Sequence, residues 1–309
     1  MDLIEKMMQL SIQYNQSPLG HRLNGLNVNE LSADEFSEVE ALWDRYGVIV
    51  ISGQILTPDQ QIAFSKRFGP LDRYLLERYN MKSHPHIFVV SNIIENGVPI
   101  GLSDAGRYWH SDMWSTPFPP RGSMLHALEV PVDSNGRALG DTFFASTAAA
   151  YDALSPDLKS KIEGRNAVYS KNAYLKHREK TAAVSKVNSN IEPVGNLDKE
   201  GMVERSANIA EEISHPLIRI HPRTKRKCIY FSEGAIDHIE GISESESNKI
   251  LEEVRQHILQ PQFMYRHSWK VGDVVLWDNC SSIHKATGDF DLPQRRRMHR
   301  TTLADPIRT

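Results

Sequence analysis

The chain has 309 residues, of which 40% are hydrophobic and 24% are charged, so it holds enough apolar material for a sizeable core. A formal net charge of −3 gives no overall attraction to nucleic acid or to an anionic membrane, and no apolar run reaches the ~18 residues of a membrane span. The two cysteines, Cys228 and Cys280, exclude a disulfide framework and a cysteine-rich zinc site, so we expect a soluble cytoplasmic protein.

The N-terminal part of the chain predicts an arm, a helix and a buried strand. Residues 1–30 are polar and are expected to lie as an arm across the domain. Ser32, with Glu35 three residues later, is a capping-box pattern that starts a helix, and Gly47 should end it. Residues 48–51 are Val and Ile only and predict a buried strand.

Short strands and capped helices follow. The further predicted elements are helices that begin at Thr57, Ser146, Ser155 and Ser243, and strands over 87–90, 123–130, 140–144, 215–219, 228–231 and 272–279. No repeat or linker divides this pattern, so we predict a single α+β domain over residues 1–309. The pattern alone leaves the β-architecture open among barrel, sandwich and jelly roll.

Residues 165–214 differ from the rest of the chain. Lys, Asn, Glu and Ser dominate there, and little apolar periodicity is visible after Lys176. A long polar connection inside a compact domain is usually a functional lid or a disordered segment. The composition leaves open a lid over the site and a solvated surface insertion, and the family resemblance given below favours the lid.

The sequence Trp109-His110-Ser111-Asp112 provides two candidate metal ligands. Side chains two residues apart in an extended strand share one face, so His110 and Asp112 could point at one ion. His284 supplies a third ligand and would complete a 2-His-1-carboxylate facial triad. With 13 histidines in the chain, the alternative is a chance pair that is merely hydrogen-bonded.

Several motifs in one order resemble the Fe(II)/2-oxoglutarate-dependent oxygenases of the taurine and 2,4-dichlorophenoxyacetate dioxygenase family. They are found at residues 47–54, 64–71, 109–112, 140–142, 149–154, 277–279, 284 and 296–300. The resemblance implies a double-stranded β-helix (jelly roll) core with flanking helices. It also implies Fe(II), O₂ and the cosubstrate 2-oxoglutarate, with the metal held by the triad residues at one mouth of the barrel.

The resemblance also implies roles for two residues at the cosubstrate. Arg296 would pair with the far carboxylate of 2-oxoglutarate, because a guanidinium matches a carboxylate bidentately. Thr142 would assist the same carboxylate. The spacing from His284 to Arg296 is one position longer than in the taurine enzymes, so Arg295 is the alternative ligand.

Three more residues are candidate substrate contacts. Arg300 matches the family position that binds a substrate's sulfonate or carboxylate, with an internal salt bridge as its alternative role. Trp114 could be a pocket wall or an ordinary packing residue. Ala235 stands where the taurine enzymes have a phenylalanine against the substrate, which would leave room for a larger molecule.

The predicted function is hydroxylation, or hydroxylation followed by cleavage, of a small anionic organic substrate, with release of succinate and CO₂. The alternatives are a desaturase or cyclase of the same family and a non-catalytic metal-binding jelly-roll protein. We expect no nucleic-acid or membrane partner, and a homo-oligomer, either a dimer or a tetramer.

Overall fold

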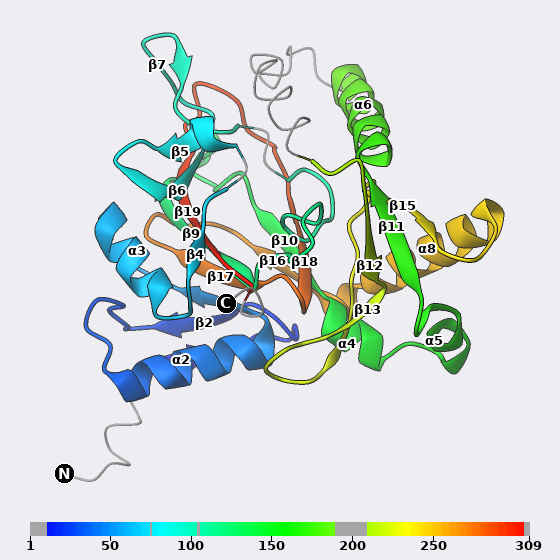
Figure 1. Cartoon of the computed structure of the whole chain (residues 1–309). Coiled ribbons are helices and arrows are strands. Elements are labelled where there is room, and N and C mark those ends of the chain that lie inside the picture. Colours follow the sequence, from blue (N-terminus) through cyan, green and yellow to red (C-terminus); the bar gives the residue numbers. More distant parts are fainter. Residues whose placement is uncertain (1–10, 75, 104–105, 189–208, 306–309) are drawn as a thin grey trace.

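The computed structural model describes residues 11–74, 76–103, 106–188 and 209–305 (Figure 1). The largest sheet in this part of the chain has nine strands. In spatial order they are β1 (Ser11–Gln13), β2 (His21–Asn24), β3 (Val48–Ile51), β17 (Val274–Asp278), β9 (Gly122–Glu129), β19 (Arg297–Leu303), β6 (His84–Ser91) and β5 (Asn80–Met81), with β4 (Leu71–Asp72) paired to β19. The pairings are antiparallel except β2–β3.

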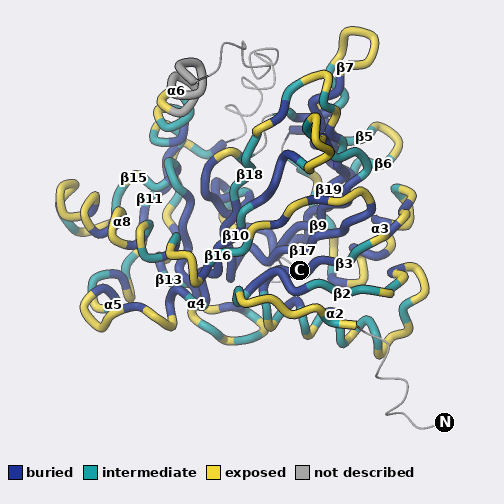
Figure 2. The backbone as a smooth tube through the Cα atoms, turned by 180° about the vertical axis from the view of Figure 1, so that it is seen from behind, coloured by how far each residue is buried: buried dark blue, intermediate teal, exposed yellow. Residues whose placement is uncertain are grey.

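The strands at the centre of this sheet are buried on both faces, as Figure 2 shows in dark blue. Helices α2 (Ala33–Tyr46) and α3 (Pro58–Lys66) cover one face. There, Ile49 packs in one cluster with Trp43 and Phe64. Val50 and Trp277 belong to the cluster on the other face. This two-sided burial explains why β3 is a continuous run of Val and Ile rather than an alternating sequence.

A second antiparallel sheet faces the first. Its strands, in spatial order, are β16 (Met264–His267), β10 (Thr142–Ser146) and β18 (Ser282–Ala286). Phe144 of this sheet packs in one cluster with Leu125, Trp277 and Met298 of the nine-stranded sheet. Two antiparallel sheets packed face to face form the predicted jelly-roll core, and the helices around them confirm the α+β class.

The remaining elements form a further layer beside the smaller sheet (Figure 1). Its strands are β11 (Asn166–Ser170), β12 (Glu212–Pro216), β13 (Ile218–Ile220), β14 (Lys227–Ile229) and β15 (Ile236–Ile239). Its helices are α4 (Thr147–Asp152), α5 (Pro156–Ile162), α6 (Lys171–Asn188) and α8 (Glu244–Ile258). The described residues also form a hairpin of β7 (Ile94–Glu95) and β8 (Val98–Pro99). Two 3-10 turns span Glu77–Tyr79 and Pro261–Phe263.

The predicted helix boundaries are confirmed where cap residues define them. Ser32 and Glu35 form the reciprocal capping box of α2, and Gly47 ends this helix in the left-handed conformation at φ 68°. The N-caps of α3, α4, α5 and α8 are the predicted residues Thr57, Ser146, Ser155 and Ser243. No helix of the described ranges is long and apolar enough to cross a membrane.

Two segments with weak sequence patterns contain regular structure, and the lid at 165–214 stays a prediction. Residues 11–13 and 21–24 are not a loose arm, because they pair as β1 and β2 at the edge of the large sheet. Within the predicted lid at 165–214, β11, α6 and β12 have regular structure, while 189–208 lie outside the described residues. The sequence pattern of β1 and β2 is weak because backbone pairing at the sheet edge, rather than an apolar periodicity, holds these strands in place.

Candidate active site

His110 and His284 come from distant parts of the sequence and meet as neighbouring backbone. The His110 amide donates to the carbonyl of His284 at 3.0 Å, and the His284 amide donates back at 2.9 Å, as an isolated β-bridge. The predicted extended strand through Asp112 is wrong. The chain turns at Asp112, where Met113 has a φ of 51° and the Asp112 amide donates to the side chain of Asn279 instead.

The two imidazoles and the carboxylate converge in a buried cluster. Asp112 Oδ1 lies 3.8 Å from Nε2 of His110 and 3.9 Å from Nε2 of His284. One ligand atom from each residue lies within 4.8 Å of the others. Nδ1 of His110 contacts the carbonyl oxygen of Tyr108 at 2.8 Å, which aims its Nε2 at the cluster. The donor set and its spacing fit a 2-His-1-carboxylate metal site.

The carboxylate of Asp112 is oriented by two donors on one oxygen. The hydroxyl of Ser123 and the indole N–H of Trp277 donate to Oδ2 at 2.9 and 3.2 Å, which leaves Oδ1 toward the histidines. Burial raises the pKa of this carboxyl. The positive charge of Arg300, with contributions from the two histidines and the hydrogen bond from Ser123, outweighs that effect, so the pKa of Asp112 lies below its usual value. Burial and the charge of His110 lower the pKa of His284 to about 3, which favours the neutral imidazole that ligates metals.

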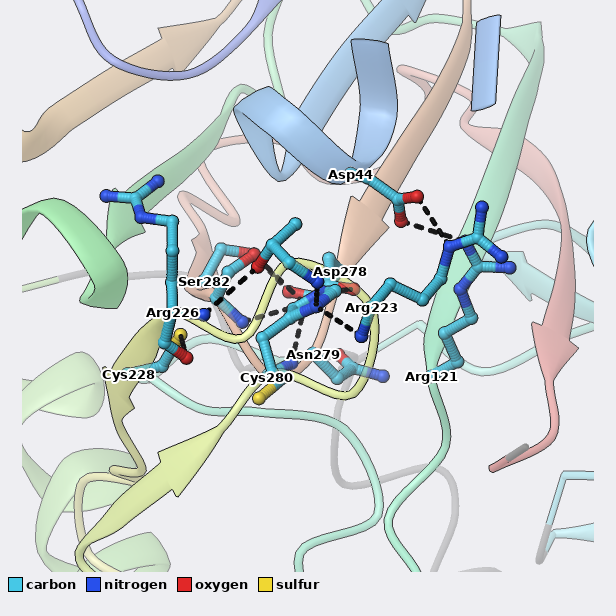
Figure 3. A network of polar contacts seen from close by, with 12 residues as sticks. Asp44, Arg121, Arg223, Arg226, Cys228, Asp278, Asn279, Cys280 and Ser282 are labelled. Atoms are coloured by element: carbon cyan, nitrogen blue, oxygen red, sulfur yellow. Dashed lines mark hydrogen bonds and ion pairs between the residues drawn. The ribbon is translucent and has the colours of Figure 1, made fainter. Parts of the chain in front are cut away.

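A buried polar network fixes the turn that carries the chain from β17 to His284 (Figure 3). Oδ1 of Asp278 accepts the amide hydrogens of Cys280 and Ser281 at 2.9 and 2.7 Å. Its Oδ2 lies 3.0 Å from Nε2 of His221. Because the carboxylate bridges the turn and a separate hairpin, the start of β18 is held in one place.

A cavity opens beside the metal cluster. Its polar lining includes Asp112, Thr142, Arg296 and Arg300. The rest is mainly apolar or aromatic and includes Tyr74, Leu76, Phe88, Val90, Leu102, Tyr108, Trp114, Phe144, Tyr174, Ile209, Trp269 and Trp277. A concave apolar site with a few convergent polar groups is the usual form of a small-molecule site.

Arg296 and Arg295 have opposite surroundings. Arg296 lines the cavity, is 6% exposed, and forms no ion pair with a carboxylate of the described residues. Burial lowers its pKa to about 10, although the charge of Asp289 acts in the other direction. Arg295 instead pairs with Glu129, Nε to Oε2 at 2.8 Å, and its side chain is 51% exposed.

Arg300, in β19, lies four residues beyond Arg296 and also lines the cavity. Its Nη1 lies 3.2 Å from Asp112 Oδ1, so the internal ion pair considered above is present. Its guanidinium also stacks over the ring of Tyr74 at 4.3 Å. Nε and Nη2 are buried and have no hydrogen-bond partner among the described residues.

The sequence matches the family described as taurine catabolism dioxygenase TauD, TfdA family over residues 12–302. The chain belongs to this family. As a member, it is an enzyme, an α-ketoglutarate-dependent dioxygenase that uses Fe(II), and the cluster of His110, Asp112 and His284 has the composition of the family's facial triad.

Curated relatives of this dioxygenase align along most of its length. It is 33% identical over 287 residues to the alpha-ketoglutarate-dependent 2,4-dichlorophenoxyacetate dioxygenase of Cupriavidus pinatubonensis, covering 89% of this chain and 90% of the relative. It is 29% identical over 286 residues to pentalenolactone F synthase of Streptomyces arenae, covering 91% of each.

Solved structures resemble the dioxygenase as a whole. AAD-2 in complex with Mn(II) and N-oxalylglycine superposes with a TM-score of 0.73 at 29% identity, covering 97% of this chain and 98% of that one. A taurine dioxygenase from Burkholderia xenovorans gives a TM-score of 0.72 at 25% identity, covering 96% and 90%. The jelly-roll prediction is confirmed by these likenesses.

The two other predicted substrate residues of the dioxygenase differ in position. Trp114 lines the cavity and also stacks on Tyr169, with ring centroids 6.1 Å apart, so it serves as both wall and packing residue. Ala235 is fully buried in the neighbouring core and does not line the cavity formed by the described residues. Its backbone carbonyl instead accepts from Ser170 at 2.9 Å, which ties it to β11.

Sequence reasoning missed several residues that support the site. Ser123 and Trp277 orient Asp112, Trp269 contacts Thr142, and Tyr74 stacks on Arg300. Trp277 lies within a motif that carried the family resemblance, which was a usable signal. The other three are single residues in strands or loops, and only the packing brings them to the cavity.

Proposed function

We propose that this dioxygenase hydroxylates a small organic acid, and cleaves it where the hydroxylated carbon bears a heteroatom. In this proposal His110, Asp112 and His284 hold Fe(II) through Nε2, Oδ1 and Nε2. Bound iron and 2-oxoglutarate supply the oxidising chemistry, in which O₂ is consumed and succinate and CO₂ are released. The single observation that carries the proposal is the presence of two buried guanidinium groups, Arg296 and Arg300, in one cavity beside the metal cluster.

Arg296 and Thr142 are the groups that would bind the far carboxylate of 2-oxoglutarate. A buried cation without an ion-pair partner is costly, so a ligand anion at Arg296 would be strongly favoured. The hydroxyl of Thr142 lines the same cavity and can donate to that anion. The ring centroid of Phe290 lies 5.7 Å from the guanidinium carbon of Arg296, so this ring helps to hold the arginine side chain in place.

Arg300 would bind an acidic group of the substrate. Its contact with Asp112 uses Nη1, while Nε and Nη2 lie on another edge of the guanidinium and have no partner in the described part of the chain. Two N–H groups on one edge match the two oxygens of a carboxylate, sulfonate or phosphonate. Because Arg300 also contacts the metal-ligating oxygen, this anion would place a nearby substrate carbon close to the metal.

The apolar wall of the cavity supports an organic body on that acid. Leu76, Val90 and Leu102 offer no hydrogen-bonding groups in their side chains, and Tyr74 and Phe88 add aromatic surface around Arg300. A substrate that fills this space would displace water and strengthen the charge contacts of Arg300. The protein thus binds, orients and desolvates the substrate.

We also propose that residues 1–309 act as one domain, with the segment at 165–214 as a lid over the cavity. Tyr174 and Ile209, the two lining residues from this segment that the structure describes, support that role. An ordered cover would keep water away from the reacting carbon.

The test is a substrate panel scored by succinate release. It contains aryloxyalkanoates, sulfonates, sulfate esters, phosphonates and amino-acid derivatives, each beside an uncharged amide or ester of the same body. We expect turnover of an acid and loss of turnover for its neutral partner. With that acid, Arg300→Ala should raise the substrate KM tenfold or more, because a charge-assisted contact contributes about 1.5–3 kcal/mol.

Two controls accompany this variant. The affinities of Arg300→Ala for Mn(II) and for 2-oxoglutarate are measured as well, because Arg300 touches Asp112. Arg297→Ala removes a charge from the same strand where the arginine pairs with Glu129 at 2.9 Å, and it should leave the substrate KM alone. Turnover of an uncharged substrate with an unchanged KM in Arg300→Ala would contradict the proposal.

A further inference from the structure

Trp269 and Thr142 form a buried hydrogen bond in the wall of the cavity. The indole N–H of Trp269 donates to Oγ1 of Thr142 at 3.0 Å. A threonine hydroxyl has one hydrogen to donate and two lone pairs that accept. Since one lone pair is taken by the indole, the hydrogen of Thr142 is directed away from Trp269.

The indole itself has little freedom to move. Trp269 is 1% exposed, and its ring meets the ring of His267 edge-on, with centroids 4.5 Å apart and an interplanar angle of 87°. His267 lies in turn 3.3 Å from Asp273, which pairs with Arg22 of β2 at 3.0 Å. A side chain packed in this way can orient a neighbour with precision that a surface residue lacks.

We propose that Trp269 is a positioning residue for the cosubstrate: it holds the Thr142 hydroxyl as a donor toward the far carboxylate of 2-oxoglutarate. This inference rests on the proposed function, in which Arg296 and Thr142 bind that carboxylate. Trp269 acts through Thr142 rather than through a bond of its own to the ligand, because its only N–H is already used.

A double-mutant cycle tests this dependence. The dissociation constant for 2-oxoglutarate is measured anaerobically on the Fe(II)-loaded wild type, Trp269→Phe, Thr142→Val and the double variant. We expect Trp269→Phe to weaken binding about 2- to 10-fold, the range of one net hydrogen bond. In the Thr142→Val background, Trp269→Phe should weaken binding no further, because the hydroxyl that it orients is gone.

A second cosubstrate separates positioning from general damage. 2-Oxobutyrate keeps the 2-oxo acid head but lacks the far carboxylate, so its affinity should be the same in wild type and Trp269→Phe. Trp43→Phe is the matched control. Trp43, in α2, is fully buried, its Nε1 has no partner among the described residues, and it packs in a cluster away from the cavity. This control should leave both affinities unchanged.

The outcomes distinguish a failure of the proposed cosubstrate site from a failure of the role of Trp269 alone. Unchanged 2-oxoglutarate affinity in both Thr142→Val and Arg296→Ala would overturn the cosubstrate site of the proposed function. If those variants weaken binding while Trp269→Phe does not, or if Trp269→Phe weakens binding equally in both backgrounds, only the role of Trp269 fails. Equal losses for 2-oxoglutarate and 2-oxobutyrate in Trp269→Phe would also overturn it.

A measurement on the wild-type side chain covers the case in which Trp269→Phe does not fold. In the Zn(II)-loaded protein, the indole ¹⁵N–¹H resonance of Trp269 is identified as the one that Thr142→Val displaces. We expect 2-oxoglutarate to shift this resonance and 2-oxobutyrate to leave it nearly in place. Equal shifts with the two ligands would contradict the positioning role.

Discussion

Arg295 and Arg296, which directly precede β19, show how two identical neighbours acquire different surroundings. Of the two, Arg296 lines the cavity and Arg295 does not. Arg295 reaches Glu129 at the surface, whereas Arg296 is buried without a described ion-pair partner. The sequence left both open as cosubstrate ligands, and their burial favours Arg296.

The first prediction compares these two arginines. Arg296→Ala should weaken 2-oxoglutarate binding about 10- to 150-fold, the equivalent of about 1.5–3 kcal/mol for a charge-assisted bidentate contact. Arg295→Ala, the matched control, should change the affinity less than twofold, because its charge is already paired and exposed to solvent. Anaerobic titration of the Fe(II)-loaded proteins gives both values. A loss in Arg295→Ala alone would reverse the assignment.

The second prediction concerns the orientation of Asp112. Ser123→Ala removes a donor at 2.9 Å from Oδ2 and should weaken Mn(II) or Fe(II) binding about 10- to 100-fold, as for other groups that orient a metal ligand. Ser65→Ala is the control, since Ser65 is equally buried but its hydroxyl donates to the carbonyl of Gln61 at 2.7 Å. Calorimetric titration measures both. Equal metal affinity in Ser123→Ala and wild type would show that the hydrogen bond from Trp277 alone is enough to orient Asp112.

At the scale of elements, the junction between α2 and β3 supports the site from behind. Gly47 ends α2 at φ 68°, and its carbonyl accepts the amide of Asp278 at 2.7 Å. The Asp278 carboxylate then holds the turn that leads to His284. A helix cap is therefore linked by a short chain of contacts to the start of the metal-ligating strand.

The third prediction tests that junction. Gly47→Ala forces a side chain into a left-handed conformation, and its Cβ would lie 2.7 Å from Ser281 Oγ. Gly53→Ala meets the same conformational cost, at φ 71°, but has nothing within 4 Å. We expect about 1–2 kcal/mol of destabilisation for Gly53→Ala and clearly more for Gly47→Ala. Denaturant midpoints of the metal-free proteins report the difference, and equal midpoints would exclude a specific role for the junction.

At the scale of the whole molecule, a buried neutral histidine contributes to the dependence of stability on pH. His299 is not among the residues that line the cavity and is 9% exposed. Burial, with the charges of His126, Arg297 and His84, lowers its pKa to about 4 from an ordinary value of 6.5. Between these two values the unfolded chain binds more protons than the folded one, so stability falls as the pH falls through this window.

The fourth prediction follows from this sign. The thermal midpoint of the metal-free protein should decline as the pH falls from 6.5 towards 4, and His299→Gln should make the decline shallower. His238→Gln, at a histidine with a 41% exposed side chain, is the control and should leave the slope unchanged. Melting curves of the wild type and of both variants across this pH series give the three slopes. A decline of the same steepness in His299→Gln would mean that other groups dominate acid unfolding.

Assembly is also a property of the whole molecule, and the predicted homo-oligomer, a dimer or a tetramer, stays a prediction. Sedimentation of the purified chain over a range of concentrations would give its state.

The sequence by itself determined those features that depend on neighbouring residues. Ser32 with Glu35, Gly47 and the other cap residues defined helix ends, because caps act through local hydrogen bonds. The spacing of His110 and Asp112, together with a family resemblance that includes the distant His284, identified the three residues of the metal cluster.

The tertiary structure decided what depends on packing between distant segments. It paired residues 11–13 and 21–24 into the sheet, placed Ala235 outside the cavity, and gave Arg295 and Arg296 opposite surroundings. It also brought Trp269 to Thr142 across 127 positions of the chain. Contacts of this kind leave no local pattern, because their partners are set by sheet register and by burial rather than by nearby residues.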